Sequence, residues 1–194
     1  KCLSTRYGKE DFADEEPLNS YLNCLRNQDH FVKNLMNQYK ELGLYEDTVF
    51  VILGDHGEAF GEHRRFQHDD VMWEEGLKVP FLIHAPGWFE NGERVEGPSN
   101  HTDVLPTVLE MLGYEIRDGE YPGYSLLRTL PEDRTLMFSC FHDKACSASL
   151  TGTEKYIYHF GNQPDELFDI SEDPLEKNNL ANERTKEELD ERRR

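Results

Sequence analysis

Asp55 and His56 follow a short apolar stretch directly, and their types and spacing suggest chemistry. A carboxylate oxygen beside an imidazole nitrogen suits a divalent metal ion such as zinc or manganese. The competing interpretation is that Asp55 caps the next helix and His56 fills a turn, because short motifs often match by chance. For the pair alone the two interpretations are about equally weighted, so the surrounding elements have to decide between them.

The residues before this pair indicate the element that must position it. Residues 49–53 are an apolar, β-branched run of strand length that ends at Gly54. Such an unbroken run is typical of a strand buried on both faces, as in a parallel sheet. Ligands of open α/β sheets bind beyond the carboxyl ends of the strands. Asp55 and His56 would therefore emerge where a site is expected.

Four further segments extend an alternation of helices and strands. Apolar residues recur at helical spacing over residues 17–42, with Pro17 in the first turn. A short helical turn is expected over 71–77 and a second apolar strand over 79–84. The segment 102–112 begins with a Thr-Asp pair, either of which can cap a helix. This order predicts an α/β fold with a largely parallel sheet flanked by helices.

The character of the sequence changes near residue 130. Short strand-like runs separated by turn signals predict a small antiparallel sheet, and they occupy residues 136–140, 145–150, 155–160 and 166–169. The charged tail from residue 183 predicts a terminal helix. We therefore expect two parts, an α/β part over residues 1–130 and a small sheet with its terminal helix over 131–194.

Composition argues against two features of this segment, nucleic-acid binding and a membrane-spanning helix. The 194 residues carry a net charge of −18, which argues against nucleic acid, because binding phosphates relies on lysine and arginine. No apolar run approaches the roughly 20 residues that a membrane-spanning helix needs.

Residues 1–16 show no periodicity and are expected to form a loop. Since the chain begins with Lys1 and shows no signal-peptide pattern, we expect it to be cut from a longer protein.

The chain has four cysteines and no C-x-x-C pair, so a zinc knuckle is not expected. Cys140 and Cys146 are close enough in sequence to bridge a short loop. Such a disulfide would indicate an oxidising compartment.

Six motifs fall in one order along the chain. They are GDHGE at 54–58, GEH at 61–63, WEEGLKVP at 73–80, TDVLPT at 102–107, ELFD at 166–169 and DPLEKNNL at 173–180. With this series the chain resembles the C-terminal half of a sulfatase-type member of the alkaline phosphatase superfamily. The resemblance covers about residues 17–182, and it implies an alkaline-phosphatase-like α/β fold.

The resemblance implies that Asp55 and His56 bind the catalytic divalent metal, which would be Ca, Mg, Mn or Zn. His68 stands where sulfatases usually have a lysine that contacts the sulfate, so it is the expected catalytic and substrate-binding residue. Relatives that transfer phosphoethanolamine or phosphoglycerol often use a histidine there. This departure leaves both sulfate and phosphate esters open as substrates.

Four residues are weaker candidates. Glu58 and Arg65 could support the metal ligands. His63, like His68, could be a metal ligand, a phosphate donor or a surface residue, and taken singly the surface interpretation is favoured for each of these two histidines. His101 matches a metal-binding histidine in two-metal branches of the superfamily. We interpret His101 as structural, because the sulfatase branch often lacks that ligand.

The resemblance also shows what this chain does not contain. Family members carry a Cys, Ser or Thr nucleophile, followed by a characteristic Pro and Arg, together with further acidic metal ligands in the N-terminal half. The pattern fails at Cys24 and at Cys146. We therefore predict that the isolated segment is inactive and that the missing N-terminal half supplies the rest of the site.

Three functions remain open at this point. The first is a metal-dependent hydrolase of sulfate esters. The second is a phosphoester hydrolase, or a phosphoethanolamine or phosphoglycerol transferase, of the same superfamily. The third is a non-catalytic binding member of the fold. An extracytoplasmic location is expected from the resemblance and the cysteines, and an upstream membrane anchor is compatible with the sequence.

Overall fold

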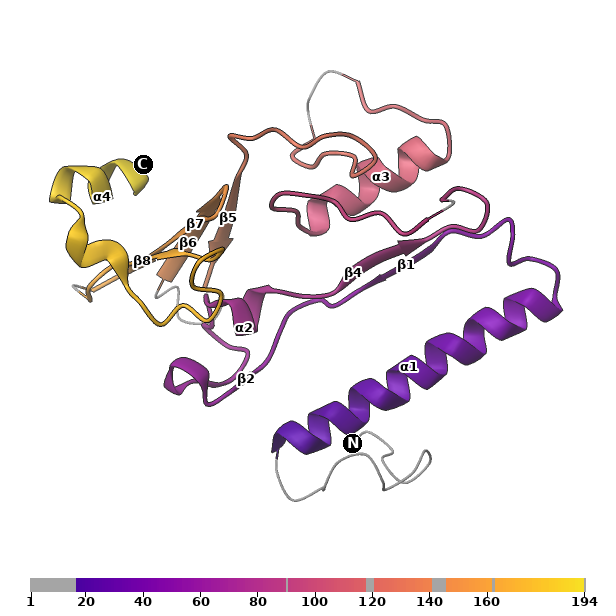
Figure 1. The fold of residues 1–194 in the computed structure, drawn as a ribbon, viewed down its shortest axis with the longest axis horizontal. Coiled ribbons are helices and arrows are strands. Elements are labelled where there is room, and N and C mark those ends of the chain that lie inside the picture. Colours follow the sequence, from indigo (N-terminus) through magenta and orange to yellow (C-terminus); the bar gives the residue numbers. More distant parts are fainter. Residues whose placement is uncertain (1–16, 90, 118–120, 141–145, 162, 194) are drawn as a thin grey trace. The chain divides into compact units, whose positions relative to one another are not determined.

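The computed structural model describes residues 17–89, 91–117, 121–140, 146–161 and 163–193 (Figure 1). The loop predicted for residues 1–16 lies outside this range. The elements are α1 (Pro17–Glu41), β1 (Phe50–Leu53), β2 (Ala59–Phe60), η2 (Glu62–Arg64), β3 (Phe66–Gln67), α2 (Glu74–Leu77), β4 (Phe81–His84), η3 (His101–Asp103), α3 (Val104–Met111), β5 (Thr135–Ser139), β6 (Cys146–Thr151), β7 (Glu154–His159), β8 (Glu166–Asp169), η4 (Leu180–Glu183) and α4 (Lys186–Arg192).

Two compact units are formed. The first unit contains the described residues up to Gln67 together with Val79–Gly92. The second unit contains His68–Lys78 and the described residues from Glu93 onward. The boundary predicted near residue 130 stays a prediction.

Helix α1 confirms the helix predicted from the apolar spacing. It begins at Pro17 and ends one residue before Leu42, where Gly43 adopts a φ of 70° and its N–H reaches the Lys40 carbonyl oxygen at 3.1 Å. A glycine in this left-handed conformation is a common way to end a helix. The ring of Tyr39 lies 5.3 Å from that of Phe50, so the helix packs beside β1. None of the described helices is both long and apolar enough to cross a membrane.

Strands β1 and β4 pair antiparallel, with Phe50 opposite His84 and Leu53 opposite Phe81. These two strands therefore do not provide the parallel pairing expected of a largely parallel sheet. Parallel neighbours need a crossover of a dozen or more residues, usually a helix, and the longest helix between these strands is the four-residue α2. The connection instead joins the end of β1 to the adjacent start of β4. Burial on both faces is also not observed, since the side chains of β1 are partly exposed.

The helix predicted over residues 102–112 is present, and Asp103, one of the two predicted caps, is the N-cap residue of α3, but the capping hydrogen bonds lie earlier, at η3. The Asn100 side chain accepts a hydrogen bond from the Thr102 N–H at 3.1 Å, and the Asp103 side chain accepts one from the Asn100 N–H at 2.8 Å. This reciprocal pair is a capping box. It starts the helical path at η3, one short turn before α3, and the Asp103 side chain makes no capping hydrogen bond to α3.

The second unit contains the predicted small antiparallel sheet, with strand order β5-β6-β7-β8 (Figure 1). Tyr156 and Leu167 form its core with Ala181 of η4. A disulfide joins Cys140, after β5, to Cys146 at the start of β6, which confirms the predicted short bridge. The sheet therefore has both an apolar core and a covalent tie at one end.

The predicted terminal helix α4 is tied to this sheet by Arg193. Its guanidinium donates to the Tyr156 hydroxyl at 3.0 Å and to the Asp165 carboxylate at 2.6 Å. Tyr156 in turn donates to Asp165 at 2.7 Å. Burial and this bond to Asp165 raise the pKa of Tyr156 to about 12. The protonated phenol is thus the form that the folded sheet favours.

We expect Tyr156 to make folding stability depend on alkaline pH. A tyrosine in an unfolded chain has a pKa of about 10. The stabilisation from the raised pKa is complete below pH 10 and is lost as the pH rises toward 12. Urea unfolding of the wild type and of Tyr156→Phe should therefore give a stability difference that shrinks across this window. A difference that stays constant from pH 10 to pH 12 would contradict this assignment.

Candidate functional site

The end of β1 is held in place by a close approach of the chain before β4. The Gly54 N–H donates to the Pro80 carbonyl oxygen at 3.1 Å, which extends the ladder by one bond. A Cβ atom at position 54 would lie 3.1 Å from the Cβ of Val79, which is tighter than most such contacts. The glycine thus allows the two segments to meet directly before Asp55.

Asp55 and His56 face each other after this strand end. The His56 Nε2 lies 3.6 Å from the Asp55 Oδ2, and the His56 backbone N–H donates to the Asp55 Oδ1 at 3.1 Å. Both side chains are accessible, with 46% of the His56 side chain and 91% of the Asp55 side chain exposed. The structure therefore brings the two predicted metal ligands together at the carboxyl end of a strand.

The His56 ring is oriented by its own backbone neighbour. Its Nδ1 lies 2.8 Å from the Gly57 carbonyl oxygen, which can only accept a hydrogen bond. The Nδ1 atom therefore carries a proton, and the lone pair of a neutral ring belongs to Nε2. A backbone carbonyl on the far nitrogen is a common way to fix the tautomer of a metal-binding histidine. The Nε2 lone pair is therefore on the ring nitrogen that lies 3.6 Å from the Asp55 Oδ2.

This arrangement fits a divalent metal ion. Two atoms that bind one tetrahedral ion at about 2.1 Å lie about 3.4 Å apart, close to the separation observed here. Glu58 offers a further carboxylate oxygen within 4.8 Å of a His56 ring nitrogen. Oxygen and nitrogen donors of this kind suit Zn, Mn and related ions. Among the described residues of the first unit, Asp55, His56 and Glu58 offer donor atoms that could hold the metal.

The other predicted residues lie on the elements that follow along the chain. His63 lies in η2 at the tip of the β2–β3 hairpin with a φ of 47°, and Arg65 ends that turn. His68 directly follows Gln67, which pairs with Ala59, and it opens the second unit. His101 begins η3 in the second unit. The roles predicted for these four residues stay predictions.

Two buried charge clusters in the second unit were not predicted. Asp103 is completely buried and its carboxylate binds the Arg134 guanidinium through two bonds of 2.7 and 2.9 Å. Lys155 is also completely buried and contacts two carboxylates. The partners are 31 or more positions apart in three of these contacts, so spacing gives no signal for them. One signal for these clusters is present in the sequence, namely Lys155, which is a charged residue inside a predicted strand.

Two family models match the chain. The Sulfatase model covers residues 3–114, and the model described as "N-sulphoglucosamine sulphohydrolase, C-terminal" covers residues 61–193. Together they include Asp55, His56 and His68, as well as the C-terminal sheet.

Curated proteins and solved structures agree with these models. An ulvan-active sulfatase of Formosa agariphila is 32% identical over 185 residues, covering 89% of this chain and 36% of that protein. The multifunctional alkaline phosphatase superfamily protein PehA of Trinickia caryophylli is 33% identical over 168 residues, covering 73% of this chain and 32% of that protein. The structure of BT4656 in complex with its substrate, D-glucosamine-2-N,6-O-disulfate, aligns with a TM-score of 0.73 at 25% identity, covering 88% of this chain and 39% of that one.

The chain spans about a third of the length of these relatives. The Sulfatase model alone matches residues 3–114 of the 194, which is more than half of the sequence. The structural alignment covers 88% of this chain, so the similarity includes the alkaline-phosphatase-like fold as well as the sequence. The chain therefore belongs to the sulfatase family.

Proposed function

We propose that the protein carrying this chain is a metal-dependent hydrolase of sulfate esters, and that this chain contributes Asp55 and His56 to the metal site. The observation that carries the proposal is the 3.6 Å separation of the His56 Nε2 and the Asp55 Oδ2 beyond β1. The ulvan-active sulfatase and BT4656, whose substrate is a disulfated glucosamine, support a sulfate ester as substrate.

Each residue has a defined task in this proposal. A divalent ion (Ca, Mg, Mn or Zn), when bound, would polarise the ester and offset charge on its peripheral oxygens. Asp55 supplies a negative ligand, and His56 keeps its proton on Nδ1 so that Nε2 can bind. Glu58 places a second carboxylate beside the imidazole. His68 would donate a hydrogen bond to an ester oxygen or protonate the leaving group.

The remaining parts of the site would come from the rest of the protein. This chain has no Cys, Ser or Thr in the nucleophile pattern of the family, and it spans about a third of its relatives. We therefore propose that the nucleophile and the other acidic ligands lie upstream, and that the isolated chain is inactive.

An extracytoplasmic location is part of the same proposal. The disulfide between Cys140 and Cys146 supports it, because disulfides persist in oxidising compartments. A membrane anchor upstream of Lys1 stays a prediction.

A phosphate ester is the second candidate substrate. It is favoured by His68, a histidine where sulfatases usually have lysine, and by the similarity to PehA. An imidazole can protonate a leaving group near neutral pH, whereas a lysine of ordinary pKa is suited to charge stabilisation alone.

A direct assay tests the proposal. The purified full-length protein and the isolated chain would be assayed on 4-nitrophenyl sulfate and 4-nitrophenyl phosphate, with the bound metal measured in each sample. We expect the full-length protein to have the higher kcat/KM on the sulfate, and the isolated chain to show no turnover. A preference for phosphate would establish the second candidate. A metal-free protein that turns over neither ester would be a non-catalytic member of the family.

A further inference from the structure

We propose that Lys155 is a positioning residue for His68, acting from inside the C-terminal sheet through the first turn of α2. This inference rests on the proposed role of His68 at the ester. All the contacts that support it lie inside the second unit, which contains both His68–Lys78 and β7.

Lys155 joins α2 to two other parts of the second unit. It lies on β7 with none of its surface exposed, and its ammonium contacts the Glu74 carboxylate at 3.1 Å and the Glu176 carboxylate at 2.8 Å. The same Glu176 accepts a hydrogen bond from the Glu74 backbone N–H at 2.5 Å. The first residue of α2 is therefore held at both its side chain and its backbone.

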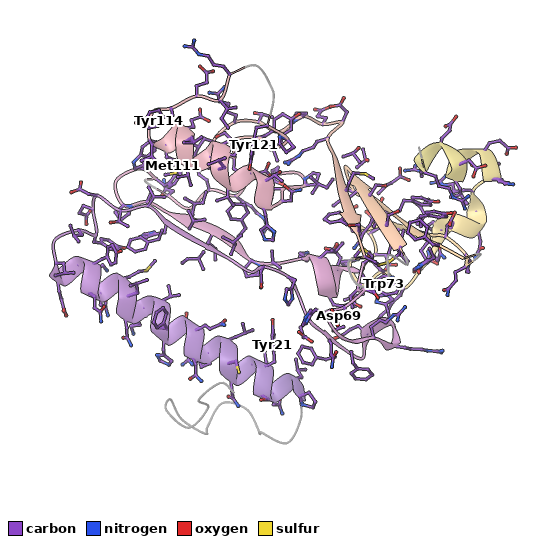
Figure 2. The ribbon with its side chains drawn as sticks, turned by 180° about the vertical axis from the view of Figure 1, so that it is seen from behind. Tyr21, Asp69, Trp73, Met111, Tyr114 and Tyr121 are labelled. Carbon is purple, nitrogen blue, oxygen red and sulfur yellow. A yellow bond between two sulfur atoms is a disulfide. The ribbon has the colours of Figure 1, made fainter. Side chains whose placement is uncertain are left out.

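A second contact holds the residue just before α2. The Trp73 indole N–H donates to the Glu166 carboxylate of β8 at 3.0 Å, and the other oxygen of Glu166 lies 2.6 Å from the His159 Nε2. Trp73 is 6% exposed and lies beside the C-terminal sheet (Figure 2). Two consecutive residues, Trp73 and Glu74, are thus bound to this sheet by polar groups that are largely buried.

The held segment extends back almost to His68. Val71 and Met72 are buried, and a Cβ at Gly76 would lie 2.4 Å from the Val71 carbonyl oxygen. The chain at 71–76 therefore folds tightly on itself. Only Asp69 and Asp70 separate His68 from this segment, so a shift of α2 would be transmitted to His68.

Removing the Lys155 ammonium would leave two carboxylates facing each other without their shared cation. Burial raises the pKa of Glu176, and Lys155 opposes that rise. Repulsion between Glu74 and Glu176, or protonation of one of them, would loosen the start of α2. A displacement of about 1 Å at a reacting group can reduce turnover on the order of 100-fold.

Adjacent positions on β7 provide a matched pair of variants. Lys155→Met keeps an unbranched side chain that is one atom shorter and removes its charge. Tyr156→Phe removes a hydroxyl from the next residue, which contacts Asp165 and Arg193 and lies on the opposite face of the strand. Both variants would be made in the full-length protein and compared at a temperature at which each is folded, with Tm measured alongside.

We expect Lys155→Met to lower kcat on the order of 100-fold, with a smaller change in KM and with the bound metal retained. The limb of the pH–rate profile that His68→Gln abolishes should shift. Tyr156→Phe should lower Tm and leave kcat and that limb unchanged. An unchanged kcat and pH profile in folded Lys155→Met would overturn the inference, as would an equal loss of kcat in Tyr156→Phe.

Two further measurements cover other outcomes. If Lys155→Met does not fold, Trp73→Phe removes the bond to Glu166 while keeping a ring, and it should lower kcat in the same direction. If the wild type has no turnover, the proposed function fails, and the imidazole NMR signal of His68 becomes the readout. That signal should move in Lys155→Met or Trp73→Phe and not in Tyr156→Phe. A stationary signal would refute the positioning role by itself.

Discussion

Replacing Asp55 by asparagine is expected to lower kcat/KM of the full-length protein for an aryl sulfate about a thousandfold, or about 4 kcal/mol of transition-state stabilisation. The carboxamide keeps the shape of the side chain and loses its negative charge. It is therefore a poorer ligand for a divalent ion, and His56 loses its charged neighbour 3.6 Å away. The measurement is steady-state kinetics combined with the metal content of the purified variant, and both should fall together.

Asp47→Asn is the matched control for this experiment. Asp47 is exposed, lies in the turn before β1 and undergoes the same change of charge and shape. Its substitution should leave kcat/KM and metal content at the wild-type level. Wild-type activity in Asp55→Asn, or full activity after loss of the metal, would refute the assignment of Asp55 as a ligand.

Replacing Arg134 by leucine is expected to lower the free energy of unfolding by about 3–5 kcal/mol, because one partner of a buried ion pair is removed. The Asp103 carboxylate would be left with no exposed surface and without its cation. It would also keep the hydrogen bonds that it accepts from the backbone N–H groups of Asn100 and Tyr124, each 2.8 Å long. These bonds hold η3 and the segment near Tyr124 against the carboxylate. Denaturant unfolding measures the expected loss in the free energy of unfolding.

Arg128→Leu is the control for the ion pair. The Arg128 guanidinium binds Glu110 at 2.9 Å, but 62% of its side chain is exposed, so solvent screens the pair. Its loss should be much less destabilising than that of Arg134. Adding Asp103→Asn to Arg134→Leu should recover part of the loss, since the uncompensated charge disappears. Equal effects of the two arginine substitutions would show that burial does not determine the strength of these pairs.

Local pattern predicted most of the elements correctly. The apolar spacing of residues 17–42 gave α1 within one residue of its observed end, and the ELFD run is β8 as predicted. Such elements depend on side-chain periodicity and on nearby helix-ending residues such as Gly43, and both can be identified in the sequence itself. The proximity of Asp55 and His56 was predictable for the same reason, because the two residues are neighbours in the chain; their role as metal ligands stays a prediction.

The pairing of the strands and the position of the helix cap were harder to predict from the sequence. The antiparallel pairing of β1 with β4 depends on how a connection without a long helix returns the chain. The cap at Asn100 depends on a reciprocal bond with Asp103, and Thr102 offered an equally good local signal. Local preference therefore named the right elements and left their partners undecided.

The sequence by itself determined the elements, the family and the residues expected to carry the chemistry, because these follow from short-range pattern and from an ordered series of motifs. The tertiary structure decided which distant charges are buried together. Lys155 meets Glu74 across 81 positions, and Arg134 meets Asp103 across 31. Burying such charges is tolerable only when oppositely charged groups meet at hydrogen-bonding distance, and that condition is set in three dimensions.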